Sequence, residues 1–230
     1  MFQMKNKLKT EEVIVFITLF LVGTLYFVYG TEYNQTATEL HSLRRAVSAQ
    51  QKITKIAQER QSSIKKVVDI ISRYNKDMPD SLKYDIANEI YSMSQKYNNL
   101  NVDLIAATIT HESAMTWDPE VTSNVGAMGL MQVMPSTGAF LAIEEGVEWS
   151  SPEDVLYDPI SNIRLGCRYL NELIGMYDKD GGLAAYNGGP KRAEMWIVGN
   201  RDYNILWEET QKYVPAVMQL YDRYRSEEVL

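Results

Sequence analysis

A run of seventeen residues without a charge, 13–29 (VIVFITLFLVGTLYFVY), constrains this chain more than any other stretch. As a helix it is at the short end of what crosses a bilayer, and it is too long and too aromatic for an ordinary buried core helix. Three lysines precede it within residues 1–12, which favours a cytoplasmic N-terminus and export of everything after Gly30. We therefore expect a short cytoplasmic segment, 1–12, followed by a single transmembrane anchor, 13–29.

A cleaved signal peptide is the alternative for the same run. The run is longer than a usual signal-peptide apolar core, and the residues after it, 31–34 (TEYN), offer no small-x-small cleavage site. No cysteine follows it, which excludes a lipoprotein anchor. We therefore expect the anchor to be retained.

The next segment, 30–78, is predicted to be a helical stalk. From about residue 37 to residue 74 it is polar and free of Gly and Pro, as a long exposed helix would be, and about 35 helical residues would span about 50 Å. A heptad series could pair with a second copy or with a partner helix, but four of its middle positions are polar or small, so a solvated stalk is favoured. The series is Leu40, Leu43, Val47, Gln50, Thr54, Ala57, Gln61, Ile64, Val68 and Ile71.

Charge and composition exclude several classes of function. The net charge is −7, and the segment 79–230 alone has 11 basic and 23 acidic residues, so nucleic acid is not an expected partner. The chain has one cysteine, Cys167, and two histidines, His41 and His111. No intramolecular disulfide and no His/Cys metal cluster can be assembled from these residues, and we expect no metal and no cofactor.

The segment 79–230 is predicted to be a mainly α-helical domain, with an acidic loop at 144–158 and at most a short hairpin between residues 117 and 132. We expect helices at 81–97 with Ser81 as N-cap, at 102–112 with Asn101 as N-cap, at 136–143 with Ser136 as N-cap, from Pro159 onward, and at 183–185, 193–198 and 208–223.

Glu112 is the candidate catalytic residue. It follows Ile105 and Ile109 at helical spacing, so the predicted helix places a carboxyl on its buried face near its C-terminal end. Desolvation and the negative end of the helix dipole both disfavour the ionised form, which predicts a raised pKa suited to a general acid. A helix cap, a buried ion pair or a solvated helix end would explain a lone carboxyl equally well.

Five blocks in sequence order favour the catalytic interpretation, because together they resemble the lytic transglycosylase (SLT) family of bacterial cell-wall enzymes. The blocks are Glu112-Ser113; Ser123 with Gly126-Ala127, Gly129-Leu130-Met131-Gln132, Met134-Pro135 and Thr137; Asn162-Ile163 with Gly166 and Tyr169-Leu170; Ala185-Tyr186-Asn187-Gly188-Gly189-Pro190, with Gly188 in place of the usual Ala; and Glu209-Thr210 with Tyr213-Val214.

The resemblance implies a lysozyme-like catalytic domain at 79–230 that cleaves peptidoglycan glycan strands. Together with the predicted anchor, this places the domain in the periplasm or outside the cell, held by one helix to a bacterial inner membrane. It implies that Glu112 is the single general acid and base and that the product is a 1,6-anhydro sugar. The implied substrate-binding residues are Ser123, Met131, Gln132, Tyr186, Asn187 and Glu209.

Chemical reasons for individual positions stand beside the resemblance. The Gln132 amide can both donate to and accept from an N-acetyl sugar. Tyr186 combines a ring face for a sugar with a hydroxyl that could reach the reacting centre. Asn162 and Tyr213 are expected to hold helices together through buried hydrogen bonds.

Two alternatives stay open. A goose-type lysozyme shares the GLMQV stretch but carries an Asp directly after it, where this chain has Met134; Asp118 and Glu120 keep a hydrolytic mechanism available. The other alternative is a membrane-anchored wall-binding or assembly factor within a secretion, conjugation or phage-related machine. The spacing from Ser113 to Pro119 is about two residues longer than the family's, so the path there is not predicted.

Overall fold

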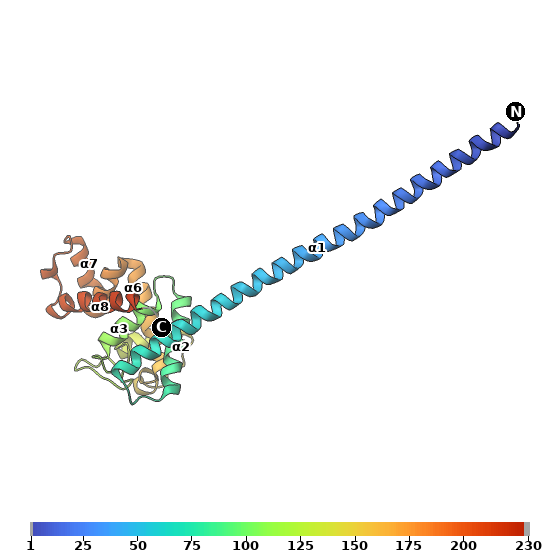
Figure 1. The fold of residues 1–230 in the computed structure, drawn as a ribbon. Coiled ribbons are helices and arrows are strands. Elements are labelled where there is room, and N and C mark those ends of the chain that lie inside the picture. Colours follow the sequence, from blue (N-terminus) through green and yellow to red (C-terminus); the bar gives the residue numbers. More distant parts are fainter. Residues whose placement is uncertain (1, 228–230) are drawn as a thin grey trace. The chain divides into compact units, whose positions relative to one another are not determined.

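The computed structural model describes residues 2–227, apart from the side chains of residues 2–8, 10, 11 and 37. The chain divides into two compact units, Met1–Gln58 and Glu59–Leu230, each described here by itself. As predicted, the described residues are mainly α-helical. In chain order the elements are α1 (Phe2–Tyr74), α2 (Asp80–Lys96), α3 (Val102–Glu112), α4 (Pro135–Glu145), α5 (Pro152–Leu156), α6 (Pro159–Gly188), α7 (Pro190–Val198), the 3₁₀ turn η1 (Tyr203–Ile205) and α8 (Glu208–Ser226) (Figure 1).

The first unit consists of the N-terminal part of α1. Its apolar side chains between residues 13 and 29 are exposed. By length and composition alone, α1 is apolar enough to cross a membrane, and a signal sequence near an N-terminus would have the same properties. The predicted cytoplasmic segment, 1–12, lies mostly outside the residues whose side chains are described.

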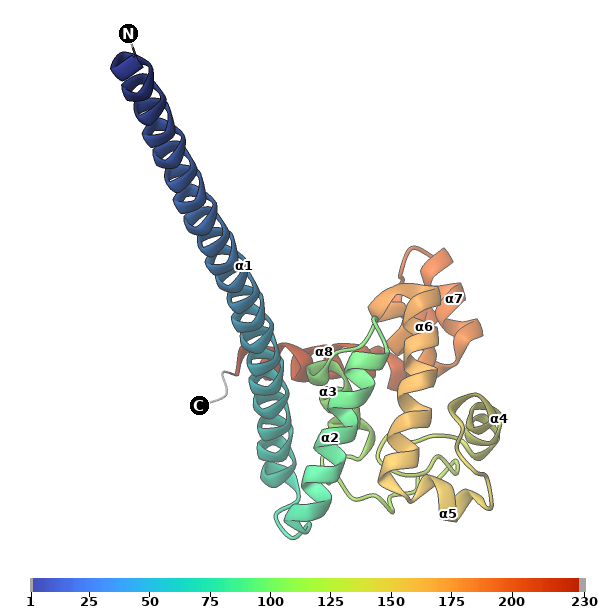
Figure 2. The ribbon, with the colours of Figure 1, turned by 90° about the vertical axis from the view of Figure 1, so that its right-hand side faces the viewer.

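The second unit is a helical domain built around α3. Every residue from Leu104 to Thr110 is buried, so α3 is covered on all sides. It packs against α2 and α8, and α6 packs against α2, α4, α7 and α8 (Figure 2). Since one end of α3 carries Glu112, the packing of this central helix fixes where the carboxyl lies.

The end of α1 belongs to the core of the second unit. Ile64, Val67, Ile70 and Ile71 are almost completely buried, although the segment up to residue 78 was expected to be an exposed stalk. Residues 64, 67 and 71 share one helix face, so the last turns of α1 present an apolar stripe. The compact unit accordingly begins at Glu59.

Helix starts agree with the sequence in part. Asn101 caps α3 as predicted, since its Oδ1 accepts a 2.9 Å hydrogen bond from Leu104 N. Ser81 and Ser136 are not caps: α2 begins at Asp80 after Pro79, and α4 begins at Pro135. The prediction ranked hydroxyl caps above proline, whose fixed φ suits the first turn of a helix.

Two further segments, the acidic loop and the turn at 183–185, differ from the expectation. The acidic loop 144–158 contains the short helix α5, capped by Ser151. The predicted helical turn at 183–185 is part of α6, which bends at Asp178, where φ is 64°. Between residues 117 and 133 the described backbone forms two isolated antiparallel bridges, from Met128 to Thr122 and to Val133, which agrees with the expectation of at most a short hairpin.

Candidate active site

Glu112 is the last residue of α3, and its side chain is partly buried. Desolvation raises the pKa of its carboxyl from 4.5 to about 7, and the nearby Glu209 carboxylate also raises it. The direction is the one that the sequence predicted. A carboxyl with this pKa is largely protonated in mildly acidic solution and can give up its proton near neutrality, as a general acid and base must.

Tyr213, from α8, faces this carboxyl. Its ring is buried, and among the described residues its hydroxyl has no partner that meets hydrogen-bond geometry. The hydroxyl nevertheless acts as a donor that lowers the pKa of Glu112, and burial together with the Glu112 carboxylate raises the pKa of Tyr213. The hydroxyl therefore lies close enough to the Glu112 carboxyl to influence it, although the pair does not meet hydrogen-bond geometry. In the described part of the chain no hydrogen bond of Tyr213 that meets this geometry joins two helices, and its interaction with Glu112 of α3 is a contact between helices that it makes.

The first turn of α8 and the end of α6 meet beside Glu112. Thr210 Oγ1 donates a 2.7 Å hydrogen bond to Asn187 Oδ1, and Asn187 Nδ2 donates a 3.4 Å bond to Glu209 Oε1. Glu209 is exposed, and its carboxylate raises the pKa of Glu112. Burial lowers the pKa of the neighbouring His111, and the Glu209 charge partly opposes that effect. Asn187 therefore orients an exposed carboxylate within electrostatic range of the candidate acid.

Tyr186 connects the end of α6 to the loop that precedes α4. Its hydroxyl donates a 2.7 Å hydrogen bond to Met131 O, and its ring lies 5.4 Å from the Tyr169 ring. Burial and the Glu112 carboxylate both raise the pKa of Tyr186, so the phenol lies near the candidate acid. Its proton is donated to the Met131 carbonyl of the loop. The hydroxyl is thus a positioning group in this structure.

Asn162 of α6 holds the loop 121–134 in place through hydrogen bonds to its backbone. Asn162 Oδ1 accepts from Met131 N at 2.8 Å, and Nδ2 donates to Met128 O and Leu156 O, each at 2.9 Å. Asn162 is completely buried, so it has the structural role that the sequence suggested. Gly129 makes this contact possible: with φ of 77°, a Cβ there would lie 2.2 Å from Asn162 Nδ2.

Three of the predicted substrate-binding residues, Ser123, Met131 and Gln132, make contacts that stabilise this loop. The Met131 side chain is completely buried, with its Sδ 3.8 Å from Cys167 Sγ. Gln132 Nε2 donates to Val121 O and Gly129 O, which leaves its Oε1 for a ligand. Ser123 Oγ accepts from Ala127 N at 3.0 Å and closes a turn.

The longer segment after Glu112 is anchored by Trp117, which is completely buried. Its backbone N donates to Ser113 Oγ and its Nε1 donates to Thr110 Oγ1, both at 3.1 Å. Ala114, Met115 and Trp117 have φ of 50°, 62° and 51°, a region that side chains with a Cβ rarely adopt. Packing of the indole therefore holds a strained turn directly behind the candidate acid.

Asp118 and Glu120 are exposed residues with no hydrogen bond to Glu112 among the described contacts. Asp118 Oδ1 accepts a 3.0 Å hydrogen bond from Glu120 N. Neither contributes to the pKa of Glu112, whereas Glu209 does. Within residues 2–227, no group of three or more His, Cys, Asp or Glu side chains is arranged to hold a metal ion.

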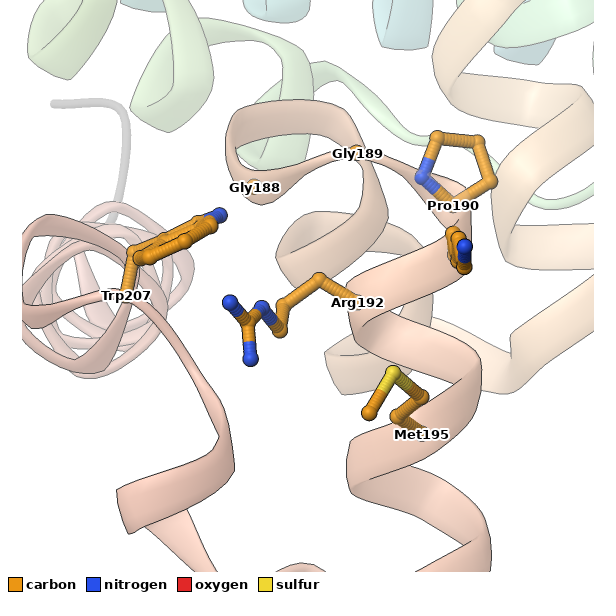
Figure 3. A pocket seen from close by; sticks show the side chains of 7 residues that line it. Gly188, Gly189, Pro190, Arg192, Met195 and Trp207 are labelled. Atoms are coloured by element: carbon orange, nitrogen blue, oxygen red, sulfur yellow. The ribbon is translucent and has the colours of Figure 1, made fainter.

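The sequence did not single out Lys191, Arg192 and Trp207, which line a cavity next to Asn187 (Figure 3). The signal available was a pair of adjacent cations directly after Pro190 in an otherwise acidic segment.

Comparison with known proteins gives a consistent result. The family described as Transglycosylase SLT domain matches residues 89–206, more than half of the chain. A putative soluble lytic murein transglycosylase of Haemophilus influenzae is 37% identical over 136 residues, which cover 55% of this chain and 23% of that protein. The membrane-bound lytic murein transglycosylase D of Escherichia coli K12 is 30% identical over 137 residues, 55% of this chain and 29% of that protein.

A solved structure shares the fold of this domain. It is an inactive glutamate-to-glutamine mutant of the lytic transglycosylase Slt of Pseudomonas aeruginosa, with a TM-score of 0.53 and 28% identity over 59% of this chain and 23% of that one. The domain thus has the lysozyme-like fold that was predicted. The chain spans about a quarter of the length of these proteins.

Proposed function

Because this chain belongs to the transglycosylase SLT domain family, we propose that it is a lytic transglycosylase that cleaves the β-1,4 bond between N-acetylmuramic acid and N-acetylglucosamine in peptidoglycan. The products carry 1,6-anhydro-N-acetylmuramic acid ends, and no water is consumed. The names of the similar proteins support the substrate class. The raised pKa of Glu112 is the observation that carries the chemistry.

In the proposed mechanism Glu112 is the only acid and base. Its carboxyl protonates the glycosidic oxygen, the bond from that oxygen to C1 breaks, and the acetamido group of N-acetylmuramic acid stabilises the positive charge at C1. The Glu112 carboxylate then removes the proton of the 6-hydroxyl as O6 bonds to C1, which regenerates the acid. A substrate-assisted route of this kind needs no second carboxyl group.

The structure supports distinct contributions from the other proposed site residues. Gln132, with a free Oε1, and the exposed Glu209 offer polar contacts to a sugar, and Asn187 holds Glu209 in place. Tyr186 presents a partly buried ring beside Glu112. Met131 and Ser123 shape the loop that carries Gln132, so in our proposal they act on the substrate through that loop.

The electrostatics favour this function over a goose-type hydrolase. A hydrolase needs a group that activates water opposite the acid, and neither Asp118 nor Glu120 is among the groups that shift the pKa of Glu112. Glu209 does shift this pKa, and in our proposal it contacts the sugar while a hydrogen bond from Asn187 orients it.

Membrane attachment forms part of the proposal. The exposed apolar run 13–29 supports a single-pass anchor in an inner membrane, with the domain in the periplasm or outside the cell. A similar protein named as membrane-bound is compatible with this placement. Between the anchor and the domain, α1 exposes Leu40, Leu43 and Val47, a stripe through which the stalk could pair with a second copy or with a secretion-type machine.

The test uses the full-length chain in detergent with purified cell-wall sacculi, and mass analysis of the released sugars. We expect anhydromuramyl products, one water lighter than hydrolytic products, and none from Glu112→Gln. Reducing-end muramyl products would establish a hydrolase instead. Binding of sacculi without any release of sugars would support a wall-binding or assembly factor.

A second measurement tests the electrostatic contribution of Glu209. In Glu209→Gln the negative charge is lost but a carbonyl acceptor for Asn187 remains, so the pKa of Glu112 should fall. The initial rate with sacculi should then decline at lower pH than in the unmodified chain. An unchanged pH profile would show that the carboxylate does not influence the reacting acid.

A further inference from the structure

A cavity of about 470 Å³ lies where α6 gives way to α7, opposite the start of α8. Figure 3 shows the side chains of Arg192 and Met195 on α7 directed toward the same space as Trp207, which precedes α8. Its lining is Gly188, Gly189, Pro190, Lys191, Arg192, Met195 and Trp207. The volume suits part of a small organic ligand.

Two cations without ion-pair partners line this cavity. Among the described residues neither Lys191 nor Arg192 forms a salt bridge, although the segment 79–230 has 23 acidic and 11 basic residues. The other arginines of the unit include several that pair with carboxylates: Arg73 with Glu227, Arg164 with Glu89, Arg168 with Glu144 and Arg201 with Asp178. Unpaired cations beside a cavity in an acidic domain favour a ligand that is itself negatively charged.

The Arg192 guanidinium is held in a defined orientation. Its Cζ lies 3.8 Å from the centre of the Trp207 ring, which is 57% exposed. Stacking on an indole leaves the N–H groups at the edge of the guanidinium plane free, and their fork matches the two oxygens of a carboxylate. Because one face of Trp207 is covered by Arg192, the exposed lining offers a charged edge rather than an open aromatic platform for a neutral sugar.

The cavity shares a wall with the candidate active site. A Cβ at Gly188 would lie 2.7 Å from Thr210 Oγ1, so these two residues are in close contact. Thr210 donates to Asn187, and Asn187 donates to Glu209, whose charge reaches Glu112. The cavity lining is therefore linked to the Glu112 side of the site through direct contacts between neighbouring residues.

We propose that this cavity binds a free carboxylate of the peptide stem attached to N-acetylmuramic acid, through Arg192 and Lys191. The inference rests on the proposed function for the identity of the substrate. The lactyl group of N-acetylmuramic acid carries a peptide, and free carboxylates on that peptide are the anionic groups that a neutral sugar backbone lacks. Cleavage would accordingly favour strands whose stems retain their free acids over strands with amidated stems.

The test is a binding measurement that does not depend on turnover. Three probes are titrated calorimetrically into the full-length chain in detergent: the disaccharide N-acetylglucosaminyl-N-acetylmuramic acid with a tripeptide bearing free carboxylates, the same compound with carboxamides, and the disaccharide without peptide, whose lactyl carboxyl is capped as the methylamide. We expect the free acid to bind at least tenfold more tightly than the carboxamide. Raising the salt concentration should reduce the difference, because an ionic contact is screened.

Matched variants assign the effect to the cavity. In the double variant Lys191→Gln and Arg192→Gln, the preference for the free acid should disappear, while Arg223→Gln, which removes an exposed charge of α8 outside the cavity, should keep it. Arg192→Lys retains the charge but loses the planar fork, and should keep only part of the preference. Thermal unfolding of each variant checks that the domain is folded.

The outcomes separate this inference from the proposed function. Equal affinity for acid and carboxamide in the unmodified chain, or a preference that survives in the double variant, would overturn the cavity assignment while sacculus cleavage by Glu112 could still hold. A chain that prefers the free acid but releases no sugar from sacculi would retain the binding site and lose the catalytic proposal.

Discussion

The Tyr186 hydroxyl donates a 2.7 Å hydrogen bond to the backbone carbonyl of Met131, which ties the end of α6 to the loop that carries Gln132. The phenol and the carbonyl come from positions 55 residues apart in the sequence. Together with the bonds from Asn162, this bond holds the loop in place. The Glu112 carboxylate lies near enough to raise the pKa of the Tyr186 phenol.

Replacing Tyr186 by Phe removes this donor and leaves the Met131 carbonyl without it. We expect a loss of about 1–3 kcal/mol in the free energy of unfolding, as for other buried acceptors that lose their donor, and a lower rate with sacculi. Tyr84→Phe is the control, because Tyr84 is 43% exposed. Equal unfolding midpoints for the two variants in guanidinium chloride would show that the bond contributes nothing.

The raised pKa of Glu112 makes stability depend on pH. The unfolded carboxyl ionises near pH 4.5 but the folded one near 7. The stability that the protonated Glu112 gives to the folded state is therefore fully present below pH 4.5, declines as the pH rises, and is lost once the pH passes about 7. From a shift of this size, and because the side chain is partly exposed, the loss is at most about 3 kcal/mol. Glu112→Gln should match the unmodified chain at pH 4 and exceed its stability at pH 8. Equal stability at both pH values, measured by denaturant titration, would mean that the folded pKa is not raised.

Two glycines of the same loop provide a matched pair of substitutions. Gly126 and Gly129 both have positive φ, 87° and 77°, but a Cβ at Gly126 would meet nothing within 4 Å. At Gly129 it would lie 2.2 Å from both Asn162 Nδ2 and the Leu156 carbonyl oxygen. Gly126→Ala should cost about 1–2 kcal/mol from backbone strain alone.

Gly129→Ala should cost several times as much as Gly126→Ala, because the Leu156 carbonyl belongs to the backbone and cannot move aside without disturbing Asn162. Thermal unfolding followed by circular dichroism compares the two variants. Similar losses would indicate that the loop can shift as a whole to make room.

Truncation tests where the helical domain begins. A fragment starting at Glu59 keeps Ile64, Val67, Ile70 and Ile71, all buried, and the 2.7 Å ion pair between Lys66 and Asp103. A fragment starting at Pro79 loses them.

Four buried aliphatic side chains contribute roughly 6 kcal/mol or more in total, which is comparable with the whole stability of many domains. The longer fragment should therefore unfold cooperatively and the shorter one should not. Cooperative unfolding of both fragments at one temperature would place the α1 residues outside the core.

The sequence predicted those parts of the fold that depend on local patterns. Asn101, followed by apolar residues at helical spacing, was sufficient to place α3 and to put Glu112 at its end, because a cap and a periodic face are both properties of neighbouring residues. Pro159 located the start of α6 for the same reason. The lysozyme-like fold followed from the ordered motifs.

Contacts between distant segments were beyond such patterns. The stripe formed by Ile64, Val67 and Ile71 was hidden within a longer polar helix, and only its partners on other helices show that it is buried. The Met131 side chain points inward, and the Gln132 amide donates its hydrogen bonds within the loop. Both features depend on the backbone conformation of the loop, which Asn162 of a separate helix holds in place. The adjacent cations Lys191 and Arg192 are consecutive in the sequence, but the cavity that they line also needs Trp207 from a later segment, which the sequence does not place beside them.

The one cysteine of the chain, Cys167, is completely buried beside Met131, and burial raises the pKa of its thiol. A thiol that is both enclosed and protonated reacts slowly with alkylating reagents. The natural chain therefore provides a nearly silent background for maleimide labelling. A single cysteine introduced at the exposed Ser42 would show whether that position is accessible from outside intact cells, as the proposed anchor requires, without any prior change to the domain.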